Sequence, residues 1–404
     1  MKHRIVVLGA GYAGAVTAAR LAKRLHRDEV EITLVNGEPD FVERIRLHQL
    51  AAGQDLPRRP LREMFAGTGV RVRTAWVGSV DAEARTVELT DGPEGRTPSP
   101  LPYDTLVYAL GSTAADHGVP GVTEHAHTLA GRQGALRLRA RLAELAPGDT
   151  VLIAGGGLTG IEAATEIAEA HPHLKVAVAA RGGVGDWLSE KARRHLDATF
   201  ARLDITVHEN ADITRVERDG VVTATAGHLP ARVTVWTTGF TVHPVAAAST
   251  LQVSDTGRIV VDGTMRSVSH PEVYAVGDAA FAQGAGGAPL RMACATATPM
   301  AWQAADALAA RLTGRKVPQE TIGYALQCVS LGRRDAIVQR VTEEDEVTPT
   351  VFTGRFGARV KELICAATTW GIKHPTMLTP TRRHHVVAAT PNTPTAIHAT
   401  ATGN

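Results

Sequence analysis

One pattern occurs twice in this chain: a short apolar run, a glycine-rich turn, an alanine-rich segment and a second apolar run. The first copy reads RIVVLGAGYAGAVTAARLAKRL and continues with EITLVNGEPD, and the second reads TVLIAGGGLTGIEAATEIAEA and continues with KVAVAARGG. Short apolar runs separated by helix-forming segments without proline or glycine indicate buried parallel strands joined by crossover helices. The repeat therefore predicts an α/β protein with two similar strand–turn–helix–strand units.

Each turn carries three glycines in a GxGxxG arrangement. They are Gly9, Gly11 and Gly14 in the first unit, and Gly155, Gly157 and Gly160 in the second. In such a turn the first glycine permits the sharp bend, the second lets the backbone approach a pyrophosphate, and the third allows close packing of helix on strand. The N-terminus of the following helix attracts the negative charge of the phosphates. Two such units in one chain predict two dinucleotide sites.

The residue that binds a ribose hydroxyl is usually acidic and ends the second strand of each unit. Asn36 stands there in the first unit, where it can bind a hydroxyl without charge or serve only as a turn residue. The second unit has Ala180 and Arg181 instead. An arginine without a neighbouring carboxylate can receive a 2′-phosphate, which favours NADPH over NADH unless Arg181 is simply a solvated surface residue.

Bulk composition excludes several classes of protein. A net charge of +2 spread over 404 residues predicts no nucleic-acid partner. No signal peptide and no apolar run long enough to span a bilayer occur, so a cytoplasmic protein is expected. The spacing of Cys294, Cys328 and Cys365 fits neither a disulfide framework nor a metal site, so we expect small buried residues and no metal.

Five motifs in order give the chain a family resemblance. They are GAGYAG, ALGS at Ala109–Ser112, GGGLTGIE, WTTGF at Trp236–Phe240 and VYAVGDAA at Val273–Ala280. With them the chain resembles the two-dinucleotide flavoproteins, which are pyridine nucleotide-dependent FAD oxidoreductases, and within that family the type II NADH dehydrogenases. The resemblance implies FAD in the first unit and NADPH or NADH in the second.

The implied fold class is α/β, with two Rossmann-like domains and a small C-terminal α+β segment. The predicted parts are the FAD-binding domain in residues 1–118 and 246–322, the NAD(P)-binding domain in 119–245, a C-terminal segment in 323–378 and a disordered tail in 379–404.

The resemblance also implies the residues that contact each cofactor. For FAD they are Gly9, Gly11, Tyr12, Ala13, Gly14, Asn36, Arg44, Ala109, Gly111 and Asp278, with Asp278 on the ribityl chain. For the nicotinamide nucleotide they are Gly155, Gly157, Leu158, Thr159, Gly160, Arg181 and Gly239.

Two residues are candidate catalysts. The resemblance implies that Glu162 lies near the flavin and nicotinamide rings, whereas a plain glutamate at a helix N-terminus is the alternative. His48 is a candidate proton donor, or else an FAD-contact or surface residue. The segment Phe41–Gln49 contains no cysteine, although disulfide reductases of this family carry their redox cysteine pair there, so thiol–disulfide chemistry is not expected.

The match is weakest at the acceptor site. Type II NADH dehydrogenases carry glutamines that line the quinone site, but CATATPMAWQ has Ala295, Pro299 and Met300 around the expected positions, with Gln303 roughly a turn away. The basic residue that those enzymes place near the flavin is missing from the part of YALQCVSLGRR before the LGR turn. The residues predicted to line the substrate site are Met300, Gln303, Tyr324 and Gln327, with Gln303 open to a purely helix-surface role.

An apolar stripe marks the predicted helix at Arg359–Lys373. It comprises Val360, Leu363, Ile364, Ala367 and Trp370, with Lys361 and Lys373 at its flanks. We expect the stripe to cover the flavin domain or a partner subunit, such as a second copy in a homodimer. Weak contact with the inner face of a membrane is the alternative.

Three functions are consistent with the sequence. The first is hydride transfer from NAD(P)H through flavin N5 to an organic, quinone-like acceptor. The second is a flavoenzyme of a specialised-metabolite pathway acting on a dedicated small molecule, even without nicotinamide turnover. The third is a redox-responsive binding protein in which FAD is structural or sensory.

Overall fold

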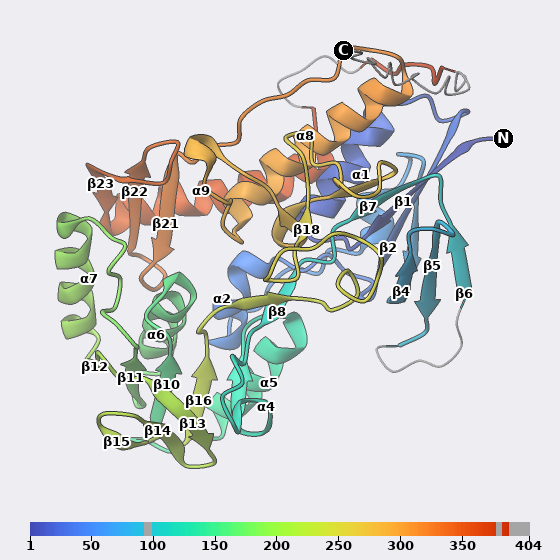
Figure 1. Ribbon diagram of the computed structural model, residues 1–404. Helices are drawn as coiled ribbons and strands as arrows, with labels where there is room; N and C mark the ends of the chain where they lie inside the picture. Colours follow the sequence, from blue (N-terminus) through green and yellow to red (C-terminus); the bar gives the residue numbers. More distant parts are fainter. Residues whose placement is uncertain (93–98, 377–381, 388–404) are drawn as a thin grey trace, which may run out of the picture.

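The computed structural model describes residues 1–92, 99–376 and 382–387, and two five-stranded parallel sheets form its framework (Figure 1). The first sheet has the order β19 (Val273–Ala275), β7 (Thr105–Tyr108), β1 (His3–Leu8), β2 (Val30–Asn36) and β3 (Val70–Thr74). The second has the order β12 (Ile205–His208), β11 (Lys175–Ala179), β10 (Thr150–Ala154), β16 (Val233–Trp236) and β9 (Ala126–Thr128).

The two sheets repeat one topology, as the sequence repeat predicts. In each, the strand before the glycine turn is central, β1 in one and β10 in the other, and the strand after the crossover helix lies beside it. Most residues of these strands are buried, which explains why they are nearly continuous apolar runs. The predicted α/β class with two Rossmann-like units is confirmed.

Helices cover the sheets and connect their strands. The helices are α1 (Tyr12–Arg24), α2 (Leu47–Ala51), α3 (Leu61–Met64), α4 (Val122–His125), α5 (Arg132–Ala143), α6 (Leu158–Ala170), α7 (Glu190–Arg202), α8 (Cys294–Leu312) and α9 (Gly354–Lys373). Short 3₁₀ turns are η1 (Arg44–Arg46), η2 (Gly277–Ala279) and η3 (Ala285–Gly287).

Smaller sheets surround this framework. Three are antiparallel and three-stranded: β4 (Trp76–Asp81), β5 (Thr86–Thr90) and β6 (Ser99–Pro102); β13 (Ile213–Glu217), β14 (Gly220–Thr223) and β15 (Gly227–Pro230); β21 (Leu326–Ser330), β22 (Ala336–Val341) and β23 (Val347–Thr353). Two are two-stranded: β8 (Ser112–Ala114) with β17 (Phe240–Val242), and β18 (Ile259–Val260) with β20 (Ala280–Phe281).

Two features join the units. The chain passes from the first unit to the second through β8 and leaves the second through β17, and these strands pair antiparallel. Helix α2 follows the first unit's β2 in sequence, yet its Leu47 and Leu50 lie in the hydrophobic core of the second unit. The residues of α2 between those leucines are therefore held against α6.

The C-terminal sheet β21–β23 lies over α6 and α7, and α9 runs from it toward α1 (Figure 1). Asp335, in the turn between β21 and β22, fastens this sheet to the second unit. Its carboxylate pairs with His195 Nε2 of α7 at 2.8 Å and accepts a hydrogen bond from the Gly354 amide at the start of α9, at 3.1 Å. One side chain thus fixes both the sheet and the helix that follows it.

The predicted disordered tail, 379–404, falls largely outside the described residues. The part within them, 382–387, lies against the end of α1, where His384 forms a bridge with Leu25 and its amide donates to the carbonyl of Arg24. Among the described helices, none combines the length and apolarity needed to cross a membrane.

Candidate functional site

The first glycine turn is shaped as the sequence predicts. A Cβ on Gly14 would stand 1.9 Å from the Gly9 carbonyl oxygen, and one on Gly9, where φ is +92°, would stand 2.2 Å from the Ala109 carbonyl oxygen. At Gly11 a Cβ would meet no atom within 4 Å, so the space before α1 is open. No acidic side chain occupies the first turn of α1. Close packing at two glycines and open space at the third suit a bound pyrophosphate.

Both ends of the Asn36 amide bind the protein itself. Its Oδ1 accepts from the Ala10 amide at 2.8 Å, and its Nδ2 donates to the Glu38 carbonyl at 2.7 Å. An ionised aspartate could accept the first bond but could not donate the second. This arrangement supports the turn-residue interpretation, and ribose binding by Asn36 stays a prediction.

Three other predicted FAD contacts meet next to the first turn. The Ser112 hydroxyl donates to Asp278 Oδ2 at 2.6 Å, and Arg44 Nη1 donates to the Ser112 carbonyl at 2.8 Å. Gly111, with φ +69°, brings the backbone close to the Arg44 guanidinium. On the other side, a Cβ on Gly277 would lie 3.0 Å from Ala13 Cβ, which places η2 against the start of α1. The structure thus gathers the predicted first-unit residues around one turn.

The second glycine turn repeats this geometry. A Cβ on Gly160 would stand 2.0 Å from the Gly155 carbonyl oxygen, and one on Gly155 would stand 2.9 Å from the Thr237 carbonyl oxygen. Gly157 again faces open space, directly before Leu158 and Thr159 begin α6. Gly239, with φ +153°, comes shortly after β16, which is the strand that pairs with β10. A second dinucleotide fits here by the same argument.

Arg181 is exposed just beyond β11, and within the described part of the chain no hydrogen bond or ion pair engages it. Its guanidinium is therefore available to an anionic ligand.

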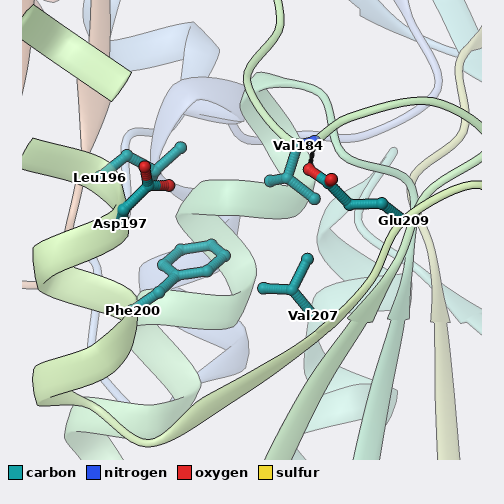
Figure 2. A pocket seen from close by; sticks show the side chains of 6 residues that line it. All are labelled: Val184, Leu196, Asp197, Phe200, Val207 and Glu209. Atoms are coloured by element: carbon teal, nitrogen blue, oxygen red, sulfur yellow. Dashed lines mark hydrogen bonds between the residues drawn. The ribbon is translucent and has the colours of Figure 1, made fainter. Parts of the chain in front are cut away.

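A cavity of about 340 Å³ lies between α7 and β12 of the second unit. Figure 2 shows Phe200 and Val207 across this cavity, with Glu209 accepting the Val184 amide at 3.1 Å. None of the predicted site residues lines it.

Glu162 is the centre of a buried polar cluster. Only 5% of the residue is exposed. Its Oε1 accepts hydrogen bonds from the Ser330 amide at 3.0 Å and from the Lys361 ammonium, and its Oε2 lies 3.6 Å from His48 Nδ1. Lys361 also donates to the Cys328 carbonyl at 3.1 Å. The cluster therefore joins α6, α2, β21 and α9, and it brings together both predicted catalytic residues.

The charges in this cluster follow from burial and pairing. Burial lowers the pKa of His48 to about 4, so its imidazole is neutral at neutral pH. Burial alone would raise the pKa of Glu162, but the Lys361 ammonium outweighs it and holds that pKa below its usual range. Conversely, burial opposes the charge of Lys361, yet the Glu162 carboxylate raises the pKa of the ammonium. The cluster is an ion pair beside a neutral imidazole.

Lys361 is not the flanking charge of the apolar stripe on α9 that the sequence pattern predicts. The helix face that packs inward comprises Gly357, Lys361, Cys365, Thr369 and Ile372. The prediction that the stripe covers the flavin domain is wrong, because Leu363 and Trp370 are 69% and 48% exposed. Lys361 thus places a basic group beside Glu162 from α9. No signal within α9 could have identified it, because Glu162 is 199 residues away in sequence.

The predicted substrate residues lie elsewhere and bind one another or the backbone. Met300 is buried in the core, and Gln303 donates to the carbonyls of Gly263 and Pro318. Gln327 donates to Asp345 Oδ1, and the Tyr324 hydroxyl accepts from the Arg291 amide. No hydrogen bond of these four described residues reaches Glu162, His48 or Lys361. A substrate role for them stays a prediction.

The three cysteines have no disulfide partner, and Cys365 is buried whereas Cys294 and Cys328 are half-buried. Burial raises the pKa of Cys294 to about 12 and that of Cys328 to about 11, so both are protonated thiols at neutral pH. Such thiols are poor nucleophiles, which agrees with the expected lack of thiol–disulfide chemistry.

A cleft of about 450 Å³ reaches the cluster from solvent. Lys361, Gln49 and Cys365 line it together with residues of α9 and of the β21–β22 turn: Ser330, Gly332, Arg333, Arg334, Asp335, Arg355, Ala358, Arg359 and Glu362. Asp335 and Glu362 are engaged by His195 and Arg46, so the remaining charge of the lining is positive. A small molecule in this cleft would meet Lys361.

Comparison with known proteins identifies the family that the chain resembles. The sequence pattern of the pyridine nucleotide-disulphide oxidoreductases matches residues 3–309. An NADH dehydrogenase-like protein of Mycobacterium tuberculosis is 28% identical over 305 residues, covering 69% of this chain and 73% of that protein. A type II NADH:quinone oxidoreductase of the same species is 26% identical over 332 residues, covering 71% and 68%. The solved structure of NDH2 from Plasmodium falciparum in complex with NADH has a TM-score of 0.76 at 13% identity, covering 95% of this chain and 99% of that chain.

The two kinds of glycine in the first turn can be separated by mutation. Gly14→Ala places a methyl group against the Gly9 carbonyl, so the strand and helix must move apart; we expect the apoprotein to lose roughly 1–3 kcal/mol of unfolding free energy. Gly11→Ala meets no protein atom, so we expect unchanged apoprotein stability but weaker dinucleotide binding. Chemical denaturation and cofactor titration of both variants test this. Equal destabilisation of the two apoproteins would contradict it.

Proposed function

Because the chain belongs to the pyridine nucleotide-disulphide oxidoreductase family, we propose that it reduces a quinone with electrons that pass from NADH or NADPH through FAD. The family establishes the coarser statement: the protein is an FAD-dependent oxidoreductase that uses a nicotinamide nucleotide. The quinone is our proposal. A relative named as a type II NADH:quinone oxidoreductase supports it.

The observation that carries the proposal is the buried cluster of Glu162, His48 and Lys361. It holds one carboxylate, one neutral imidazole and one ammonium together, reached by a cleft from solvent. A quinone takes up protons as well as electrons, so its reduction needs groups that hold and move protons next to the acceptor. An ammonium also stabilises negative charge that develops on a quinone oxygen.

When bound, FAD supplies the two-electron chemistry that links oxidation of the nicotinamide to reduction of the acceptor. The glycine turns would hold the two dinucleotides, and Asp278 and Arg44 would orient the first. Glu162 would orient a bound ring by a charge that Lys361 maintains. His48, neutral and with Nε2 unbonded among the described residues, can accept a proton at that atom or pass it on.

The alternatives have less support. None of the relatives and structures named above is described as an enzyme of a specialised-metabolite pathway. If FAD were purely structural or sensory, the buried ion pair and the cleft that reaches it would have no function under that interpretation. Turnover with an acceptor separates both alternatives from the quinone reductase.

The outward face of α9 gives the enzyme a means of reaching a quinone dissolved in lipid. Phe356, Leu363 and Trp370 are exposed on it, with Arg355 and Arg359 beside them. An apolar stripe flanked by arginines suits the interface of a membrane that contains anionic lipid. We propose that this face, with the neighbouring cleft, docks on such a surface.

The first experiment is an anaerobic titration of the flavin-loaded protein with NADPH and with NADH. We expect either nucleotide to bleach the flavin, with NADPH preferred because Arg181 can bind its 2′-phosphate. Adding a soluble quinone should restore the absorbance. In Arg181→Ala we expect affinity for NADPH to fall roughly tenfold and affinity for NADH to stay unchanged, as loss of a charge-assisted contact implies. A flavin that neither nucleotide bleaches would rule out the proposed reaction.

A second experiment removes the ammonium. In Lys361→Met the largest influence that opposes the burial of Glu162 is gone, so the pKa of its carboxyl rises. The limb of the pH–rate profile that needs the carboxylate then moves to higher pH. Breaking a buried pair costs about 3–5 kcal/mol of unfolding free energy, or less when Glu162 takes up a proton. Steady-state quinone reduction from pH 5 to 9 measures the shift. Lys373→Met, at an exposed position of the same helix, is the control. A pH profile identical to that of the unaltered enzyme would refute the role of Lys361.

A third experiment tests the membrane face. Leu363→Glu places a charge in the exposed stripe, and we expect at least a roughly tenfold loss of binding to phosphatidylglycerol vesicles, as burial of a leucine contributes about 1.5–3 kcal/mol. Reduction of a soluble quinone should not change. Val207→Glu is the control, because Val207 is an exposed apolar residue on β12 of the second unit and not on α9. If Leu363→Glu instead dissociates a dimer in sedimentation and vesicle binding is unaffected, the stripe is a subunit interface.

A further inference from the structure

A second buried carboxyl lies one helical turn from Glu162. Glu166 is only 1% exposed, and it stands on the same face of α6, four residues along. Residues with this spacing have their Cβ atoms about 5–6 Å apart. The charge of Glu162 also raises the pKa of the Glu166 carboxyl, so the two groups interact electrostatically. Glu166 is therefore the nearest titratable neighbour of Glu162 on α6.

Glu166 is joined to groups that reach the surface. Its Oε1 accepts a hydrogen bond from Gln54 Nε2 and lies 3.9 Å from Arg333 Nε, whose side chain is 43% exposed. The next carboxylate along the helix, Glu169, is exposed and accepts the Arg333 amide at 3.0 Å. The row Glu162, Glu166 and Glu169 thus leads from the buried cluster to solvent.

A structural role accounts for only part of this arrangement. Acceptance of the Gln54 hydrogen bond by Oε1 ties the segment after α2 to α6, which a glutamine could do as well. The other oxygen, Oε2, is buried and has no hydrogen-bond partner among the described residues. Burying a carboxyl with one unsatisfied oxygen is unfavourable, and native proteins keep such groups mainly where they act.

The charges around Glu166 favour its protonated form near neutral pH. Burial raises the pKa of its carboxyl to about 7, helped by Glu169 and Glu162 on α6 and opposed by Arg333 and the Gln54 amide. From α5, Arg139 contacts the carbonyl of Gln54 but pairs with the exposed Asp55. A group with such a pKa both gains and loses protons readily at physiological pH.

The proposed reaction needs a proton from solvent. A hydride taken from NAD(P)H supplies two electrons and one proton, whereas a quinone reduced to a quinol takes up two electrons and two protons. The balance is NAD(P)H + H⁺ + quinone → NAD(P)⁺ + quinol. One proton per turnover must therefore reach the buried cluster of Glu162 and His48 from water.

We propose that Glu166 relays this proton, taking it from the surface around Gln54, Arg333 and Glu169 and passing it to Glu162. The inference rests on the proposed quinone reduction. Glu166 acts through Glu162 and touches no substrate, so it is a relay residue and not a catalytic one. Its proton leaves Oε2 for the Glu162 carboxylate, and a proton from the surface restores it.

The test uses Glu166→Gln in the flavin-loaded enzyme, because glutamine keeps the hydrogen bond to Gln54 but cannot carry a proton. Stopped-flow experiments measure flavin reduction by NADPH or NADH and, separately, reoxidation by a soluble quinone from pH 5 to 9. We expect flavin reduction to change less than about twofold, because hydride transfer needs no proton from solvent. Reoxidation should slow roughly 10–100-fold, since it loses a positioned proton carrier.

The pH profile distinguishes a relay from a structural role. In the unaltered enzyme the reoxidation rate should fall as pH rises through about 7, where Glu166 loses its proton. Glu166→Gln should lack this inflection, and Glu166→Asp, which still titrates, should restore it. The matched control is Glu190→Gln on α7, an exposed glutamate whose side chain is 86% accessible. An unchanged profile and rate in Glu166→Gln would overturn the proposal.

A stability measurement shows that the variant folds. Because the folded-state pKa of Glu166 lies above its unfolded value, its ionisation destabilises the protein as pH rises through about 7. Glu166→Gln should therefore be at least as stable as the unaltered protein at pH 8, and a large loss of stability there would overturn the assignment. If NADPH bleaches the flavin of the unaltered enzyme but no quinone reoxidises it, the proposed quinone reduction is wrong. This outcome is distinct from the one that refutes the relay, which is seen only in Glu166→Gln.

Discussion

The ion pair between Lys361 and Glu162 holds together parts of this molecule that are far apart in sequence. Glu162 comes from the second nucleotide-binding unit, Lys361 from the C-terminal helix, and the Ser330 amide that shares the carboxylate from the C-terminal sheet. Burial works against both charges, so each is stable only while the other is in place. Assembly of the second unit, β21 and α9 is thereby coupled to the charge of the functional site. A chain that failed to dock α9 would leave Glu162 either protonated or solvated.

The glycine turns impose a different constraint, which acts through the backbone. Gly14 and Gly160 bring each helix so close to its strand that a single methyl group would strike a carbonyl oxygen. Gly11 and Gly157 leave space where a phosphate can approach the helix N-terminus. The two turns are interchangeable in shape, so the difference between the sites lies at the ends of the second strands. There the side-chain amide of Asn36 forms hydrogen bonds with the backbone of Ala10 and Glu38, whereas the guanidinium of Arg181 remains available to a ligand.

Much of the fold could be predicted because it depends on short segments. Strand, glycine turn and helix are each encoded within about 20 residues, and the repeat then predicts two units with one topology. Lys361 and Glu166 could not be found in this way, because their neighbours are distant in sequence. Helix α9 has an apolar stripe at Leu363 and Trp370 that is more conspicuous than its inner face, and amphipathicity alone does not say which face turns inward. Tyr324 and Gln327 are predicted to line the substrate site, and in the structure their polar groups pair with Arg291 and Asp345.

The two faces of α9 differ in how much apolar surface their side chains contribute. On the inner face Gly357 lets α9 approach β22 closely, since a Cβ there would stand 2.7 Å from the Ala336 carbonyl oxygen. Small residues contribute little apolar surface, so the hydrophobic signal of the helix comes from the outer face instead. An exposed apolar face lowers solubility unless something covers it, which implies a selective reason to keep it. Contact of that face with lipid would place the adjoining cleft at the membrane surface, so one helix would both hold the charge of Glu162 and bring the site to its acceptor.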